Sequence, residues 1–154
     1  MFRSILVAVD GSPASTCALK EAVGIARSEG ARLTLISVAR VPPLPMGVGP
    51  FAAPLWTEDD LEYSAREVLE EAENLIPDGV PFSSVVGHGP APAAIVNRVN
   101  AACHDLVVMG SRGLGPAGAF VLGSVSRAVV AQSPVPVLVT RAEQAEPLEP
   151  AFAT

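Results

Sequence analysis

The chain has 154 residues, of which 49% are hydrophobic and 17% are charged, and its formal net charge at pH 7 is −6. This length suits a single domain with a substantial core, and the composition excludes a chain that is disordered throughout. The acidic balance also argues against binding to duplex nucleic acid, which needs clustered basic residues to neutralise phosphates.

The first forty residues predict a strand, a helix and a second strand. Residues 5–9 form a nearly continuous apolar run, which is typical of a strand covered on both faces. Ser12 and Pro13 fit the cap and first position of a helix, and Gly30 fits its end. Residues 33–38 are the second strand. The sequence shows neither a signal peptide nor an apolar stretch long enough to span a membrane, so we expect a cytoplasmic protein with no membrane partner.

The next segment carries most of the charge. Residues 41–56 hold five prolines and two glycines, which predicts a long, partly ordered loop. Residues 58–75 show the apolar stripe of an amphipathic helix. Residues 58–73 contain eight acidic residues against Arg66, a balance of −8 + 1 = −7, so the remainder of the chain is close to neutral. We interpret this run as a solvated helix face, with a partner-docking surface as the alternative.

The second half of the chain continues the alternation. We expect strands at residues 81–86, 105–109 and 135–140 and helices at residues 92–102 and 123–132. Pro81 fits the first position of a strand or a sheet edge, because proline cannot donate to a ladder. Residues 1–141 then form one nucleotide-binding domain, and we expect residues 142–154 to be a disordered acidic tail.

Strands that alternate with helices predict an α/β fold with an open five-stranded parallel sheet and helices on both faces. Right-handed crossovers favour the flavodoxin-like, Rossmann-like type with strand order 3-2-1-4-5. In such sheets, ligands bind beyond the carboxyl ends of the strands, at the point where the strand order reverses.

Two loops at that edge carry suitable chemistry. The first strand ends at Asp10, whose carboxylate suits ribose hydroxyls or a metal that bridges phosphates. After the fourth strand, glycines permit close backbone approach, and a predicted helix N-terminus offers N–H donors to an anion. Turn glycines and an ordinary helix cap explain either loop alone, whereas the two together favour a nucleotide-like anion. The second loop contains Gly110, Arg112, Gly113, Gly123, Ser124, Val125 and Ser126.

Other motifs do not support a function. The chain has no GxxxxGK[ST] sequence, which excludes a Walker-type loop, and residues 113–118 match GxGxxG outside the strand–helix context that this motif needs. Residues 103–105 read Cys-His-Asp but are consecutive, so they indicate a helix end, and His88 is interpreted as a turn residue. No nucleophile is paired with a general base.

Gly110, Gly113, Gly123 and Ser124 follow the pattern Gly, two residues, Gly, nine residues, Gly-Ser. With the opening strand up to Asp10, this pattern resembles the universal stress protein family of the ATP-binding type over residues 2–141. The resemblance implies a stress-response regulator that binds ATP and forms a homodimer through the last strand, from Val135 to Thr140.

The same resemblance assigns roles to individual residues. Asp10 would contact the ribose, Val38 the adenine, and Met109 and Gly110 the base and sugar side. Mg²⁺ or Mn²⁺ would bridge the phosphate oxygens, with Asp10 as the candidate protein contact. The phosphate cradle would consist of Arg112, Gly113, Gly123, Ser124, Val125 and Ser126.

Two alternatives remain at this level. Residues 114–122 contain no basic residue, which predicts a modest affinity for triphosphate. A slow ATPase or phosphotransfer enzyme would need a base, for which Asp10 is the candidate. The other alternative is an interaction module that uses the proline-rich loop and binds either no nucleotide or a cyclic one.

Overall fold

The computed structural model describes residues 1–40, 56–111 and 122–142. Its sheet has five parallel strands in the order β3-β2-β1-β4-β5, which confirms the predicted fold class and strand order. Residues 41–55 of the proline-rich loop, Arg112, Gly113 and residues 143–154 of the predicted tail lie outside the described residues. The strands are β1 (Ser4–Ala8), β2 (Arg32–Val38), β3 (Phe82–Gly87), β4 (Leu106–Gly110) and β5 (Val137–Thr140).

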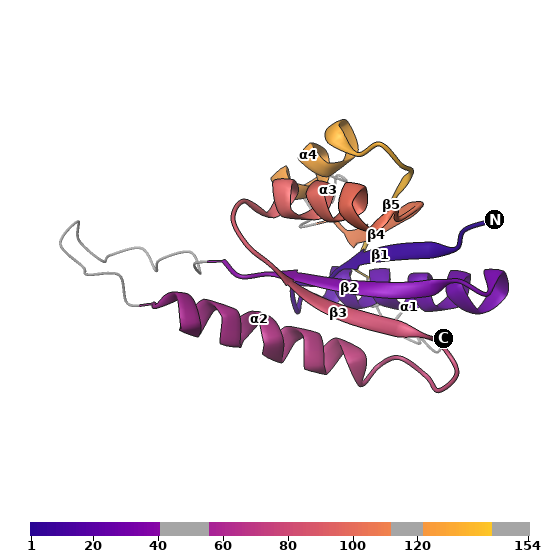
Figure 1. Cartoon of the computed structure of the whole chain (residues 1–154), viewed down its shortest axis with the longest axis horizontal. Coiled ribbons are helices and arrows are strands. Elements are labelled where there is room, and N and C mark those ends of the chain that lie inside the picture. The colour runs from indigo at the N-terminus through magenta and orange to yellow at the C-terminus, as the bar shows by residue number, and fades with distance from the viewer. Residues whose placement is uncertain (41–55, 112–121, 143–154) are drawn as a thin grey trace, which may run out of the picture.

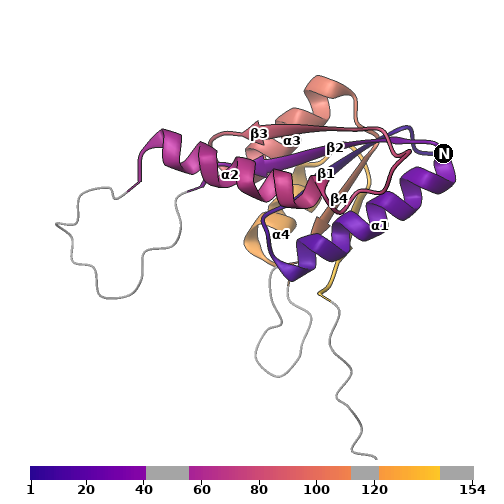
Figure 2. The ribbon, with the colours of Figure 1, turned by 90° about the horizontal axis from the view of Figure 1, so that it is seen from below.

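Two helices cover each face of the sheet. Figure 1 shows α3 and α4 above the sheet and α2 below it, and Figure 2 shows α1 and α2 from below. Side chains of α1 and α2 share one core cluster, and side chains of α3 and α4 share the other. None of the helices in the described part of the chain combines the length and apolar character that a membrane crossing requires. The helices are α1 (Pro13–Glu29), α2 (Glu58–Glu73), α3 (Ala91–Ala102) and α4 (Ser124–Gln132).

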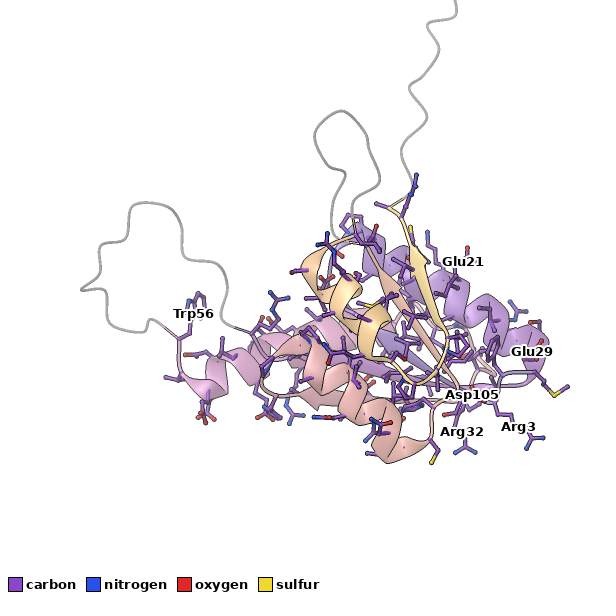
Figure 3. The ribbon with its side chains drawn as sticks, turned by 90° about the horizontal axis from the view of Figure 1, so that it is seen from above. Arg3, Glu21, Glu29, Arg32, Trp56 and Asp105 are labelled. Atoms are coloured by element: carbon purple, nitrogen blue, oxygen red, sulfur yellow. The ribbon has the colours of Figure 1, made fainter. Side chains whose placement is uncertain are left out.

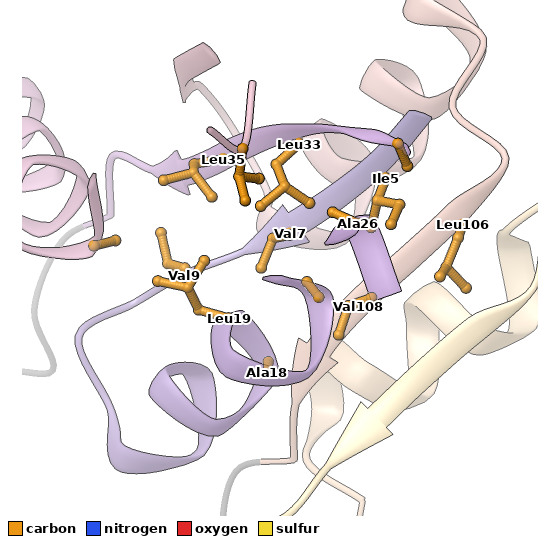
Figure 4. Close-up of a cluster of buried hydrophobic side chains, with 14 of the residues drawn as sticks. Ile5, Val7, Val9, Ala18, Leu19, Ala26, Leu33, Leu35, Leu106 and Val108 are labelled. Carbon is orange, nitrogen blue, oxygen red and sulfur yellow. The ribbon is translucent and has the colours of Figure 1, made fainter. Parts of the chain in front are cut away.

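The central strand β1 contributes to a core on each face of the sheet. Ile5 and Val7 point toward α1 and α2, whereas Leu6 points toward α3 and α4, and all three are fully buried. Figure 4 shows the first cluster, in which Leu19 of α1 packs against Val9 and the β-strand side chains. Burial on both faces explains why this strand is a continuous apolar run.

The acidic run forms the exposed side of α2. Ala65, Leu69 and Ala72 are buried against the sheet, whereas most of the helix's carboxylates are exposed. Thr57 and Asp60 form a capping box at the start of this helix, with the Thr57 N–H donating to Asp60 at 2.8 Å. This placement agrees with a solvated helix face.

The Cys-His-Asp sequence forms a helix end, as predicted. Cys103 ends α3 in the left-handed conformation, with φ at 52°. The Asp105 carboxylate accepts hydrogen bonds from the N–H groups of Arg3, at 2.8 Å, and Ser4, at 3.1 Å. Figure 3 shows Asp105 and Arg3 at one end of the molecule, away from Trp56 at the other. This corner therefore anchors the amino ends of β1 and β4.

Candidate functional site

A pocket lies beyond the carboxyl ends of β1, β2 and β4, at the point where the strand order reverses. It encloses about 500 Å³, its open mouth included. This is the position that the parallel topology predicts for a ligand. The pocket is lined by Ala8, Val9, Asp10, Ser12, Ser15, Ile36, Val38, Arg40, Ala91, Ile95, Met109, Gly110, Val125 and Ser126.

One side of the pocket is apolar. Ile36 and Val38 come from β2, Ile95 comes from α3, and Met109 comes from β4. Ile36, Ile95 and Met109 are at most 4% exposed and belong to the core between the sheet and the helices α3 and α4. The pocket is therefore a gap at the edge of that core. A flat aromatic ring could bury its faces there without losing hydrogen bonds.

Asp10 occupies the rim of the pocket between β1 and α1. One of its carboxylate oxygens, Oδ1, accepts a hydrogen bond from the Ser12 N–H at 3.0 Å. Gly11 between them has φ at 79°, which lets the chain reverse directly after the strand. Ser12 then caps α1 by accepting from the Ser15 N–H at 3.2 Å. The turn and the cap together fix where the Asp10 carboxylate stands.

Gly110 ends β4 where the first turn of α1 crosses it. A Cβ atom at Gly110 would lie 2.6 Å from the carbonyl carbon of Ala14, closer than packed atoms approach one another. Glycine is therefore required at this position by the packing of α1 against β4. This reason adds to the close ligand approach that the sequence predicted.

Ser126 joins the start of α4 to the end of β4. Its hydroxyl donates a hydrogen bond to the Gly110 carbonyl oxygen at 3.0 Å, and the residue is 2% exposed. The resemblance placed Ser126 in the phosphate cradle, and in this structure its hydroxyl hydrogen is engaged by the Gly110 carbonyl oxygen. The hydroxyl holds the first turn of α4 in place, and the Ser126 N–H belongs to that turn.

The N-terminus of α4 presents backbone N–H groups at the pocket. Its cap residue, Gly123, has no side chain, and the first turn contains no acidic residue. Val125 and Ser126 from that turn line the pocket. N–H groups of a first helical turn have no partner within the helix, and the helix dipole is positive at this end. The arrangement suits an anion such as phosphate.

The pocket gathers most of the predicted site residues. It is lined by six of them, Asp10, Val38, Met109, Gly110, Val125 and Ser126. Gly123 and Ser124 begin α4 beside the pocket without lining it, and Ser124 is exposed. Arg112 and Gly113 lie outside the described residues. No group of three or more potential metal-ligating side chains occurs in the part of the chain that the structure describes.

Several lining residues lie outside the sequence motifs. Arg40 continues the every-second-residue pattern of Ile36 and Val38, a signal that the sequence did contain. Ala91 and Ile95 come from the start of α3, and only tertiary packing brings that helix to the pocket. His88 lines a different hollow, between α2 and β3, so it does not reach this site.

The profile of the "Universal stress protein family" matches residues 1–141. A universal stress protein of Thermus aquaticus, encoded in a QAH/OAS sulfhydrylase 3′ region, is 37% identical over 147 residues. The alignment covers 92% of this chain and all of that protein. The similarity thus extends over nearly the whole length of both chains.

Solved structures agree with this match. A universal stress protein from Archaeoglobus fulgidus is 26% identical and has a TM-score of 0.71, with 91% of this chain and 99% of that one covered. A universal stress protein in complex with cAMP is 23% identical and has a TM-score of 0.70, with 92% and 99% covered. Both share the fold described above.

Proposed function

The chain belongs to the universal stress protein family, and on that premise we propose that it binds ATP in the pocket beyond β1, β2 and β4. The observation that carries the proposal is the convergence of three chemistries on one pocket. An apolar wall, the Asp10 carboxylate and the N-terminus of α4 adjoin the same pocket, and they match a base, a ribose and phosphates respectively.

Each part of the pocket matches one part of the nucleotide. The adenine would pack beside Val38 and Met109, and the ribose hydroxyls would donate to Asp10. The phosphates would accept hydrogen bonds from the first turn of α4, beside Gly123 and Ser124. We assign Arg112 and Gly113 to the phosphates from the sequence pattern alone. Three solved structures of family members are complexes with cAMP, dAMP and AMP, which supports an adenine nucleotide as the ligand class.

A divalent cation fits this site only together with the phosphates. Among the described residues that line the pocket, Asp10 is the one carboxylate. Mg²⁺ usually binds through one or two carboxylates plus substrate phosphates and water, so this donor set suits it. We propose that Mg²⁺ or Mn²⁺ neutralises phosphate charge when bound, while Asp10 and the α4 N–H groups orient the nucleotide.

This function is regulatory in our proposal. We propose binding rather than turnover as the chemistry of this pocket, since the sequence pairs no nucleophile with a general base. We propose a cytoplasmic homodimer that responds to stress through nucleotide occupancy. The dimer would form along β5, which is an edge strand of the described sheet.

Replacement of Gly123 tests the phosphate site. Its backbone angles, φ −61° and ψ 162°, are open to any residue, so Gly123→Val is expected to keep the fold. The branched side chain would stand over the first turn of α4, where phosphate oxygens must approach. We expect ATP affinity, measured by calorimetry with Mg²⁺ present, to fall at least about tenfold, the loss of roughly one charge-assisted hydrogen bond.

Gly24→Val is the matched control, because Gly24 lies on α1 with no atom within 4 Å of an added Cβ. This variant should bind ATP like the wild type. Equal affinity in the wild type and Gly123→Val would contradict the assigned phosphate site. If the wild-type protein neither releases a nucleotide on denaturation nor binds ATP at millimolar concentration, the proposed function itself is wrong.

A further inference from the structure

Arg40 follows the end of β2 and lines the pocket, yet none of the roles assigned above uses it. Ile36, Val38 and Arg40 are alternate residues, and the first two face the core beneath α3 and α4. The Ala39 N–H donates to the Gly87 carbonyl oxygen at 2.9 Å, so pairing with β3 continues beyond the last residue of β2. The strand direction therefore extends to Arg40 and places it on the pocket side of the sheet.

The charge of Arg40 is unusual for this pocket. Among the described residues that line the pocket, Arg40 carries the one positive charge, and it stands beside the apolar wall. The residue is exposed, so its guanidinium remains close to the open mouth. A cation at this position is not required by the packing of the core.

The sheet geometry separates Arg40 from the phosphate end. β1 lies between β2 and β4. Neighbouring strands are about 4.8 Å apart, so the ends of β2 and β4 are separated by roughly 10 Å. The N-terminus of α4 adjoins β4 through the bond between Ser126 and Gly110. A nucleotide with its phosphates at α4 would therefore place its base, rather than its phosphates, beside Arg40.

We propose, as an extension of the proposed function, that Arg40 lays its guanidinium on the open face of the bound adenine. The base would then lie between the apolar wall and a planar cation. Guanidinium is flat and weakly hydrated, and it stacks on aromatic faces, whereas an ammonium group remains strongly hydrated. Arg40 is in this way a base-binding residue that closes the mouth of the pocket.

The test compares adenosine with ATP in the wild type and in Arg40→Ala, by competition against a fluorescent ATP analogue. A contact with the base is shared by both ligands, so Arg40→Ala should weaken both by the same factor, about 3- to 10-fold. Arg40→Lys keeps the charge without the planar group, and we expect it to bind both ligands more weakly than the wild type. Arg27→Ala is the control for the loss of one positive charge, because Arg27 lies in the last turn of α1; it should leave both affinities unchanged.

The possible outcomes separate the two proposals. A loss for ATP with no loss for adenosine would show that Arg40 contacts phosphate, and wild-type affinity in Arg40→Lys would show that charge alone is sufficient; either result overturns the stacking contact. Unchanged affinities in Arg40→Ala overturn it as well, while the proposed function stands. If the wild type binds neither ligand, the proposed function fails, and this inference fails with it.

Discussion

Gly110 and Ser126 hold the end of β4 against two helices before any ligand is present. The absent side chain of Gly110 admits the first turn of α1, and the Ser126 hydroxyl ties the first turn of α4 to the Gly110 carbonyl. Because the α4 N–H groups are already positioned, less ordering entropy opposes anion binding. Gly110 and Ser126 belong to a motif that suggests ligand contact, yet here they position the first turn of α4.

His104 is a buried residue at the opposite end of the sheet. It is 4% exposed, its Nδ1 lies 2.9 Å from the Ser4 hydroxyl, and its Nε2 has no hydrogen-bond partner among the described residues. Burial lowers the pKa of this imidazole below its usual 6.5, and the charge of Arg98 lowers it further, while Asp105 acts in the opposite direction. The folded protein therefore favours neutral His104.

This shift predicts a pH dependence of stability. Above the usual pKa of 6.5, His104 is neutral in both states and imposes no penalty. As the pH falls below that value, His104 takes up a proton in the unfolded chain but not in the folded protein. The free energy of unfolding therefore decreases until the pH reaches the lower pKa of the folded state. We expect His104→Asn, which keeps a polar atom near Ser4, to remove this part of the decrease in the free energy of unfolding. Urea unfolding of both proteins from about pH 8 to about pH 5 measures it, and parallel pH profiles would contradict it.

At the scale of elements, the crossing of α1 over β4 leaves no room for a side chain at Gly110. The Thr140 hydroxyl also donates to the Ala14 carbonyl oxygen, at 3.1 Å, so the end of β5 joins the same contact. Backbone atoms form this contact, and backbone cannot move aside as a flexible side chain can. The spacing between α1 and β4 is therefore set by the absence of a side chain at Gly110.

Replacement of Gly110 tests that contact. In Gly110→Ala the new methyl group would meet the Ala14 backbone at 2.6 Å, and we expect the free energy of unfolding to fall by about 1–3 kcal/mol, as in other overpacked sites. The control, Gly24→Ala, adds a methyl group in open space within a helix, and should raise stability by about 0.5–1 kcal/mol. Urea unfolding measures both. Equal stability of Gly110→Ala and the wild type would show that α1 is not held at this distance.

The elements themselves were largely predictable. Ser12, Pro13 and Gly30 delimited the first helix, because capping and chain reversal depend on local chemistry. The expected ends of several helices and strands differ from the observed ones by one or two residues. The fifth strand was expected from Val135 but begins at Val137. The Ser133 hydroxyl donates to the Val135 carbonyl oxygen at 2.8 Å, so Val135 belongs to a local turn. Whether such a residue joins a local turn or pairs with the next strand depends on where that neighbouring strand lies.

At the scale of the whole molecule, the edges of the sheet determine how the protein can associate. β5 has one neighbouring strand in the described sheet, and Leu138 on it is 37% exposed. Val130 on the adjoining α4 is 47% exposed. Exposed apolar side chains beside an unpaired strand edge favour association with a second copy. These features support the proposed homodimer along β5.

Charge at this edge tests the dimer. We expect the wild type to have the mass of a dimer in light scattering and Leu138→Lys to shift toward the monomer, because an edge lysine opposes strand pairing. Leu75→Lys is the control, since Leu75 is 54% exposed and lies just after α2, away from β5. A monomeric wild type, or a dimer unaffected by Leu138→Lys, would contradict an interface along β5.

The sequence by itself determined the alternation of strands and helices, the strand order and the end of the sheet at which Asp10 and Gly110 lie. These features follow from periodicity, capping and the handedness of crossovers, which are local or nearly universal rules. Only the tertiary structure decided that the Ser126 hydroxyl bonds to Gly110, that the packing of α1 requires glycine there, and that Ala91 and Ile95 complete the pocket. Those contacts join residues from different elements, so they depend on distances between helices and strands that no local pattern encodes.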